Sequence, residues 1–113
     1  QNINTSITAP VRIVKLPANL ILVEKTPEIV RLNLTGNRMF VDALRQQDVR
    51  VELDLSSLGA GKHMIRLSRR DVDLPLGIAI DSVVPQEVAV TLKEATDNAP
   101  KKSNRPAIEE TVP

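Results

Sequence analysis

His63 is the one histidine of the chain, and imidazole is the side chain best suited to acid–base or metal chemistry near neutral pH. Asp54, Ser56 and Ser57 lie close to it in the sequence. A metal site or a hydrolytic triad needs several converging groups, yet the chain contains no cysteine and no second histidine. Serine and aspartate beside a turn commonly bind the backbone instead. We therefore expect a structural role for His63.

The segment that contains His63, LGAGKHM (residues 58–64), has a glycine spacing faintly similar to that of a phosphate-binding loop. Such a loop requires a glycine where Ser56 stands and a serine or threonine where His63 stands. It also leads into a helix, whereas this segment separates two strand patterns. A glycine-containing hairpin connection is the better interpretation.

Acidic side chains form the second group with possible chemistry. Glu52 and Asp54 project from the same side of one predicted strand, as paired catalytic carboxylates would. Asp71, Asp73 and Asp81 follow further along the chain. We interpret all five as part of the solvated face of a sheet, because this is by far the commoner arrangement.

The basic residues form two clusters, Arg66, Arg69 and Arg70 in one and Lys101, Lys102 and Arg105 in the other. The net charge is only +1, and the chain has no Tyr or Trp on which a base could stack. We therefore prefer solvation, or pairing with neighbouring acids, over a nucleic-acid surface. Two glycosylation sequons, at Asn4 and Asn33, occur by chance as often as by purpose. We assign no catalytic, cofactor-binding or metal-binding residue, and no cofactor.

The elements that would position these groups are mainly strands. The chain has 113 residues, enough for one domain with a real core, and 42% of them are apolar. Phe40 is the only aromatic residue, so the core must consist of Val, Ile and Leu, which favour strands. The absence of cysteine excludes disulfides and thiol catalysis. No apolar run approaches the length of a membrane span or resembles a signal peptide.

A repeated stretch organises the predicted strands. Residues 16–34 (LPANLILVEKTPEIVRLNL) and 74–92 (LPLGIAIDSVVPQEVAVTL) align without a gap at an offset of 58 residues. Five positions are identical, among them Pro17/Pro75 and Pro27/Pro85. Each copy reads as a Leu-Pro turn, a short apolar strand, a proline and a longer alternating strand. Because the offset is even, inward-facing side chains keep their parity in both copies.

Further patterns predict strands over residues 11–14, 49–55 and 65–67, and one short helix after Gly36. Asn37 is expected to cap this helix, and its apolar stripe would comprise Phe40, Ala43, Leu44 and Gln47. The ring of Phe40 would then plug one end of the core.

The chain divides into three parts on these patterns. Residues 1–9 are polar with scattered Ile and are predicted to be a flexible lead-in, and residues 10–94 form the folded domain. Residues 95–113 contain three of the eight prolines and few apolar side chains, which cannot offset the entropy of ordering them. They are predicted to be a disordered tail or a linker.

The order of these elements resembles the YbbR-like domain family. The resemblance runs from about residue 10 to residue 94, and each matching piece is a strand edge or a turn. The pieces are Pro10-Val11, Leu16-Pro17, Pro27-Glu28-Ile29-Val30, Leu34-Thr35-Gly36, Ala43-Leu44, Asp54-Leu55-Ser56, Gly61-Lys62-His63, Val84-Pro85-Gln86-Glu87-Val88 and Thr91-Leu92. The ordered series, together with the repeat, is specific where the single pieces are not.

The resemblance implies a mostly β, small α+β domain made of two similar β halves with one short helix, resembling the ribosomal L25 fold. It implies a parent protein with one membrane helix outside this chain and several such domains in tandem on the extracytoplasmic face of the bacterial membrane. The chain begins with Gln, which fits a piece of a longer protein. Proteins of this type resemble regulators of the membrane diadenylate cyclase, which makes cyclic di-AMP. The implied partners are this cyclase and the neighbouring repeats.

Two alternatives remain beside this non-enzymatic regulatory module. One is an RNA-binding β domain of the ribosomal L25 type, which the neutral charge and the single aromatic residue disfavour. The other is a structural spacer of the cell envelope. An enzyme ranks last, because His63 has no evident partners.

Overall fold

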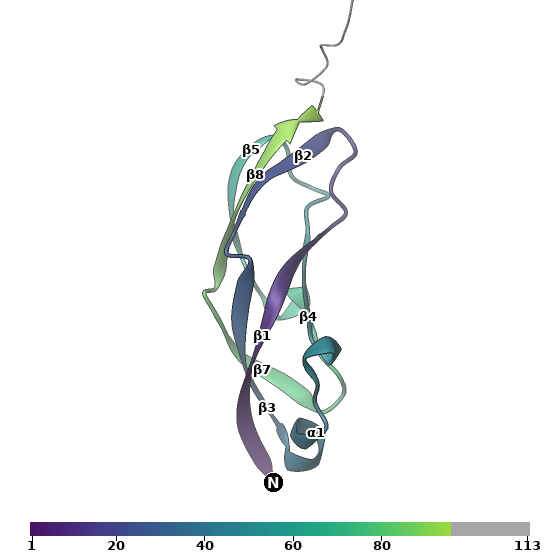
Figure 1. The fold of residues 1–113 in the computed structure, drawn as a ribbon, viewed down its shortest axis with the longest axis vertical. Helices are drawn as coiled ribbons and strands as arrows, with labels where there is room; N and C mark the ends of the chain where they lie inside the picture. Colours follow the sequence, from purple (N-terminus) through teal and green to yellow (C-terminus); the bar gives the residue numbers. More distant parts are fainter. Residues whose placement is uncertain (96–113) are drawn as a thin grey trace, which may run out of the picture.

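The computed structural model describes residues 1–95. In this part of the chain eight strands form two twisted sheets, and one short α-helix lies beside them (Figure 1). The elements in order are β1 (Asn2–Val14), β2 (Leu20–Thr26), β3 (Ile29–Asn37), α1 (Arg38–Asp42), β4 (Arg50–Asp54), β5 (Gly61–Arg66), β6 (Val72–Asp73), β7 (Ile78–Val84) and β8 (Glu87–Glu94). Short 3₁₀ helices cover Gln46–Asp48 and Arg69–Asp71. The predicted mostly β class with one short helix is confirmed.

The larger sheet has the strand order β6-β4-β1-β3-β7, and the smaller sheet has the order β2-β8-β5. Neighbouring strands are antiparallel except β1 and β4, which run parallel. β1 belongs to two partners, because residues 2–10 pair with β3 and residues 11–14 pair with β4. This long strand therefore connects the two parts of the larger sheet.

The sequence repeat is also a structural repeat. The bounds of β2 and β7 differ by 58 residues at both ends, and the loop after each contains a cis X–Pro peptide bond. The two halves exchange strands, since β7 pairs with β3 (the first junction) and β2 pairs with β8 (the second junction). Each junction has a one-residue β-bulge, at Asp81 in the first and at Val23 in the second. Leu34 opposite Ile80 corresponds to Leu92 opposite Leu22.

The core is built from the inward positions of the alternating strands. Its buried members are almost all Val and Leu, as expected for a chain with one aromatic residue. They comprise Val30, Leu32 and Leu34 of β3, Val88, Val90 and Leu92 of β8, and Val49, Val51, Leu53 and Leu55 in and around β4. The predicted inward faces of these strands are confirmed. Leu67, just after β5, is also buried.

The predicted flexible lead-in over residues 1–9 is wrong. This segment is the first part of β1 and pairs with β3 from Asn2 opposite Asn37 to Pro10 opposite Ile29. Ile3, Ile7 and Ala9 take the inward parity, and Ala9 is buried. Asn4 and Ser6 take the outward parity and bind side chains across the sheet, which the composition alone did not indicate. Gly36 likewise lies within β3 and does not end it.

The helix forms where it was predicted, but its stripe is wrong. Asn37 Oδ1 accepts a hydrogen bond from the Met39 N–H at 3.0 Å, so the cap is confirmed. The helix ends at Asp42 and buries none of its residues, because five residues are too few for a continuous apolar stripe. Phe40 is 46% exposed and does not plug the core. Its ring lies against Gly77, where an added Cβ would come within 2.5 Å of a ring carbon.

The predicted tail, residues 95–113, lies outside the described residues apart from Ala95. The Ala95 N–H donates to the Asn19 carbonyl at 2.8 Å, which holds the end of β8 beside the start of β2. At the other end of the molecule, the Arg38 N–H donates to the Gln1 carbonyl at 3.0 Å. The described chain therefore begins beside α1 and ends beside β2, at opposite ends of an elongated domain (Figure 1).

Candidate functional surfaces

His63 binds its own hairpin. Its Nε2 lies 2.8 Å from the Gly59 carbonyl oxygen, in the connection between β4 and β5. A carbonyl oxygen can only accept, so Nε2 carries a proton and donates it. The predicted structural role accords with this contact, and among residues 1–95 no group of three His, Cys, Asp or Glu side chains is placed to hold a metal ion.

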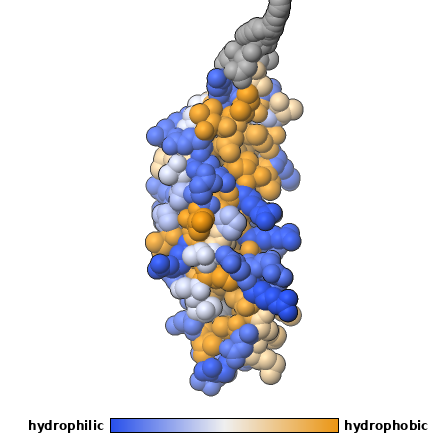
Figure 2. Space-filling model, viewed as in Figure 1, coloured by the Kyte–Doolittle hydropathy of each residue, from blue (hydrophilic) through white to orange (hydrophobic). Residues whose placement is uncertain are grey.

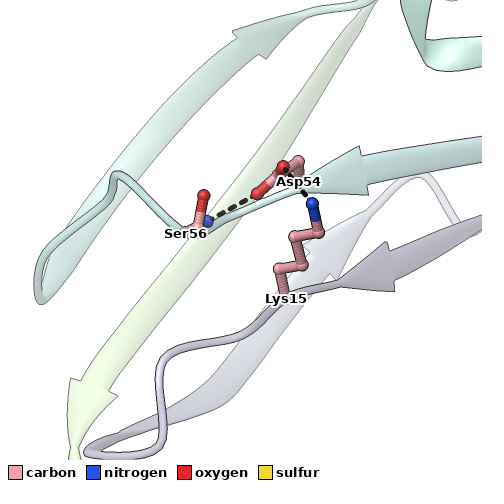
Figure 3. Close-up of polar contacts among 3 residues, drawn as sticks. All are labelled: Lys15, Asp54 and Ser56. Carbon is pink, nitrogen blue, oxygen red and sulfur yellow. Dashed lines mark hydrogen bonds and ion pairs between the residues drawn. The ribbon is translucent and has the colours of Figure 1, made fainter.

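Asp54 closes the turn after β4 (Figure 3). Its Oδ1 accepts the Ser56 N–H at 2.8 Å, and its Oδ2 lies 3.8 Å from Lys15 Nζ. Hydrogen bonding from the side chain and backbone of Ser56, together with the charge of Lys15, lowers the pKa of Asp54 below its ordinary value. A carboxylate of lowered pKa is a weak base, so Asp54 suits turn formation better than proton transfer.

Asp71 also has a backbone partner, in an open depression that several acidic residues line. Glu52, Asp54, Asp71 and Asp73 line one open depression, but Lys15 and Arg70 line it too. Asp71 Oδ2 accepts the Ser68 N–H at 2.8 Å and so caps the second 3₁₀ helix. The depression is therefore a mixed-charge surface in which two carboxylates bind the backbone.

The first basic cluster is spread over two elements. Arg66 lies at the end of β5, where its Nη2 donates to Gln86 Oε1 at 3.2 Å, and Arg69 and Arg70 lie on the second 3₁₀ helix. The second cluster, Lys101, Lys102 and Arg105, lies outside the described residues. Arg66 is therefore bound within the domain, and the chain offers no Tyr or Trp beside these arginines on which a base could stack.

A polar row across β1, β3 and β7 was not predicted. Ser6 Oγ donates to Asn33 Oδ1 at 2.7 Å, and Asn33 Nδ2 donates to Ser82 Oγ at 2.8 Å. The two sequon asparagines, Asn4 and Asn33, thus lie on paired strands and not on loops. The spacing of two residues between Asn4 and Ser6, repeated at Asn33 and Thr35, is the sequence signal that could have revealed the row.

Thr35 of β3 forms a second set of polar contacts across the same three strands, with Asn4 of β1 and Asp81 of β7. Its Oγ1 lies 2.9 Å from Asn4 Oδ1 and also contacts Asp81 Oδ2. A hydroxyl has one proton and a carboxylate can only accept, so Thr35 donates to Asp81. The Asn4 amide, turned to present its nitrogen, then donates to Thr35. The bulge at Asp81 brings this carboxylate over the row.

Lys25 is a further residue that the sequence did not single out. Its Nζ donates to the Val11 carbonyl at 2.6 Å and lies 3.1 Å from Glu28 Oε1, while the side chain is only 16% exposed. The Val11 N–H in turn donates to the Glu28 carbonyl at 2.8 Å. This lysine therefore ties β1 to β2 between the two sheets. At the corresponding position of the second repeat, 58 residues later, stands Val83.

Apolar side chains are exposed at both ends of the molecule (Figure 2). We name Met39, Phe40 and Leu76 the amino-terminal tip, where Met39 is 75% and Leu76 90% exposed. We name Ile21 and Val23 the carboxy-terminal patch, where Val23 is 57% exposed. Exposed apolar groups that lie together commonly mark a contact surface.

Within the described part of the chain, no helix is long and apolar enough to cross a membrane. The model of one protein family, described as YbbR-like protein, matches residues 7–92. A comparison with curated proteins gives no significant match.

Several solved structures are similar to the chain, among them the following three. A YbbR-like domain from Listeria monocytogenes is 27% identical with a TM-score of 0.69, and the match covers 85% of this chain and 98% of that one. A YbbR family protein from Desulfitobacterium hafniense is 22% identical with a TM-score of 0.66, over 80% and 96% of the two chains. A YbbR-like protein from Streptococcus pneumoniae is 23% identical with a TM-score of 0.66, over 83% of this chain but only 48% of that one. The likeness to the ribosomal L25 fold stays a prediction.

Proposed function

Because the chain belongs to the YbbR-like protein family, we propose that it is a non-enzymatic domain that acts through protein contacts. The family match over residues 7–92 is the observation that carries the proposal. A second support is that the side chains best suited to chemistry bind the domain's own backbone. His63 contacts the Gly59 carbonyl, Asp54 accepts the Ser56 N–H and Asp71 accepts the Ser68 N–H.

In the finer form of the proposal, the parent protein is anchored by a membrane helix outside this chain and regulates the membrane diadenylate cyclase. This domain is then one of several repeats on the extracytoplasmic face of the bacterial membrane. The support for this form is the family resemblance of the sequence. The partners are the cyclase and the neighbouring repeats.

The test is the cyclic di-AMP level in cells that carry the cyclase, with and without the full-length parent of this chain. A version that lacks the whole domain, residues 1–95, is compared at matched expression. We expect the level to change when the parent is removed and the change to be reproduced by the deletion. An unchanged level on removal of the parent would contradict the regulatory role.

A structural spacer is the second candidate, and one observation favours it. The described chain begins and ends at opposite ends of the elongated domain, so the domain adds its full length to a longer chain (Figure 1). A spacer is tested by replacement of residues 1–95 with an unrelated domain whose termini have the same separation. Full function of this replacement favours the spacer, whereas loss of function favours a specific contact surface.

A further inference from the structure

The amino-terminal tip is a compact apolar cluster. The Phe40 ring lies against Gly77, whose φ of +87° fits glycine at this turn. Met39 and Leu76 directly precede these two residues, so all three apolar side chains lie at the same end of the molecule. No residue of α1 is buried within the domain. The tip therefore presents its apolar surface outward.

The carboxy-terminal patch has an internal control in the repeat. Ile21 and Val23 of β2 correspond to Ala79 and Asp81 of β7, in the same register and with the bulge at the same place. The fold therefore accepts a small and a charged side chain at these positions. Large apolar groups on β2 are not required for folding, and they point to a contact outside the domain.

We propose that the carboxy-terminal patch of one copy of this domain binds the amino-terminal tip of a second copy, head to tail. The chain begins at the tip, where Gln1 binds Arg38, and continues from Ala95 beside the patch. If a second copy follows in the same chain, residues 96–113 join the patch end of the first copy to the tip end of the second. The patch of one copy and the tip of the next are therefore the two ends nearest each other along the chain. The inference rests on the proposed function, which names neighbouring repeats as partners, and deepens it by assigning the two surfaces through which such repeats bind each other.

The charges at the two ends permit this contact. The tip has one exposed basic and one exposed acidic side chain, Arg38 and Asp42. Two exposed basic and two exposed acidic side chains surround the patch, Lys62, Lys93, Glu24 and Glu94. No net charge of either end opposes the approach of the other. The apolar surfaces are small, so the contact is weak between free molecules and gains strength when a linker joins the copies. Because the two surfaces differ, the contact is open-ended and produces a linear array.

The test is self-association of the full chain, followed by sedimentation velocity and amide chemical shifts. Concentrations extend to about 1 mM, which is the effective concentration that a short flexible linker provides. Val23→Asp places a charge in the patch, and the same residue type, Asp81, stands at the equivalent bulge of the second repeat. Leu76→Asp places a charge in the tip, at a side chain that is 90% exposed. Val84→Asp, on an exposed apolar residue away from both ends, is the matched control, and circular dichroism checks that each variant is folded.

We expect the unsubstituted chain and Val84→Asp to associate beyond dimers, and each end variant to associate at least about tenfold more weakly, because a charge enters the apolar contact. An equal mixture of Val23→Asp and Leu76→Asp should regain association and stop at one-to-one pairs, since each variant keeps one intact end. Absence of association in the unsubstituted chain, or a mixture no better than its components, would overturn the proposal. So would binding to phosphatidylglycerol vesicles that Leu76→Asp abolishes, without self-association. Cyclic di-AMP plays no part in these measurements, so they fail or succeed independently of the proposed function.

Discussion

The two junctions between the halves have the same backbone register but different outer faces. On the inner side, Leu32 and Leu34 of the first junction correspond to Val90 and Leu92 of the second, and all four are buried. On the outer side, the first junction places Asp81 where the second places Val23. The inward aliphatic residues thus determine the pairing, and the outer face is free to diverge toward different contacts.

The outer faces also differ in how they use hydrogen bonds. Asn33 bonds to both Ser6 and Ser82, whereas Thr91 at the equivalent place has one bond, to Glu24 at 3.3 Å. Side-chain hydrogen bonds therefore connect three strands (β1, β3 and β7) at the first junction and two strands (β2 and β8) at the second. We therefore expect the outer polar contacts to stabilise the first junction more than the second.

The largest expected effect tests the inner side, which the two junctions share. Val90→Asp should lower the free energy of unfolding by more than about 4 kcal/mol or prevent folding, because it buries an unpaired charge. Leu32→Asp, at the corresponding position of the first junction, should be equally damaging. Thr91→Asp on the outer side should cost less than about 1 kcal/mol. Urea unfolding of the three variants measures this, and similar stabilities for Val90→Asp and Thr91→Asp would contradict the assignment of the faces.

A smaller effect tests the difference between the outer faces. Asn33→Ala removes two side-chain hydrogen bonds and should lower the free energy of unfolding by about 1–2 kcal/mol. Thr91→Ala removes one long bond and should cost about 0.5 kcal/mol or less. Parallel urea titrations decide the comparison. An equal loss in both variants would show that the polar row adds nothing to the first junction.

The smallest effect lies outside both junctions, at Asp54. Its pKa is lowered in the folded protein, so its contribution to stability is complete above the unfolded pKa of about 3.9 and is lost as the pH falls through the folded value. Asp54→Asn lacks this titration, and its stability should therefore fall less between neutral pH and about pH 3. Thermal unfolding across this pH range makes the measurement. Identical pH profiles of the unsubstituted chain and Asp54→Asn would show that the titration of Asp54 does not contribute to the loss of stability in acid.

Most strands could be predicted because their aliphatic residues alternate without interruption. Val30, Leu32 and Leu34 show this clearly, whereas the first nine residues offer only Ile3, Ile7 and Ala9 among polar side chains. Asparagine and serine on the outer side of that strand (Asn2, Asn4 and Ser6) gave a composition typical of a loop. The stripe of α1 was predicted too long because Phe40, Ala43, Leu44 and Gln47 have helical spacing, although the helix itself ends at Asp42. So few positions can match a period of 3.6 by chance.

The strand exchange and the contacts of Lys25 could not be predicted, for a different reason. A hairpin within each half and an exchange between halves satisfy the same alternating pattern, so only long-range packing decides between them. The inward parity of Lys25 is visible only once β2 is paired with β8, where it lies opposite Val90. The turn roles of Asp54 and His63 are local, and for that reason their sequence neighbours were informative.

The exchange of β2 and β7 has a consequence for the ancestry of the chain. Each half, separated from the other, has a long strand (β3 or β8) with one partner in its own half and a second partner in the missing half. Such a unit completes its sheet only by association with an identical unit, as a two-fold symmetric homodimer. Gene duplication and fusion of that dimer would give one polypeptide with the repeat observed here. Later divergence could then act on each half separately, as Val23 and Asp81 illustrate.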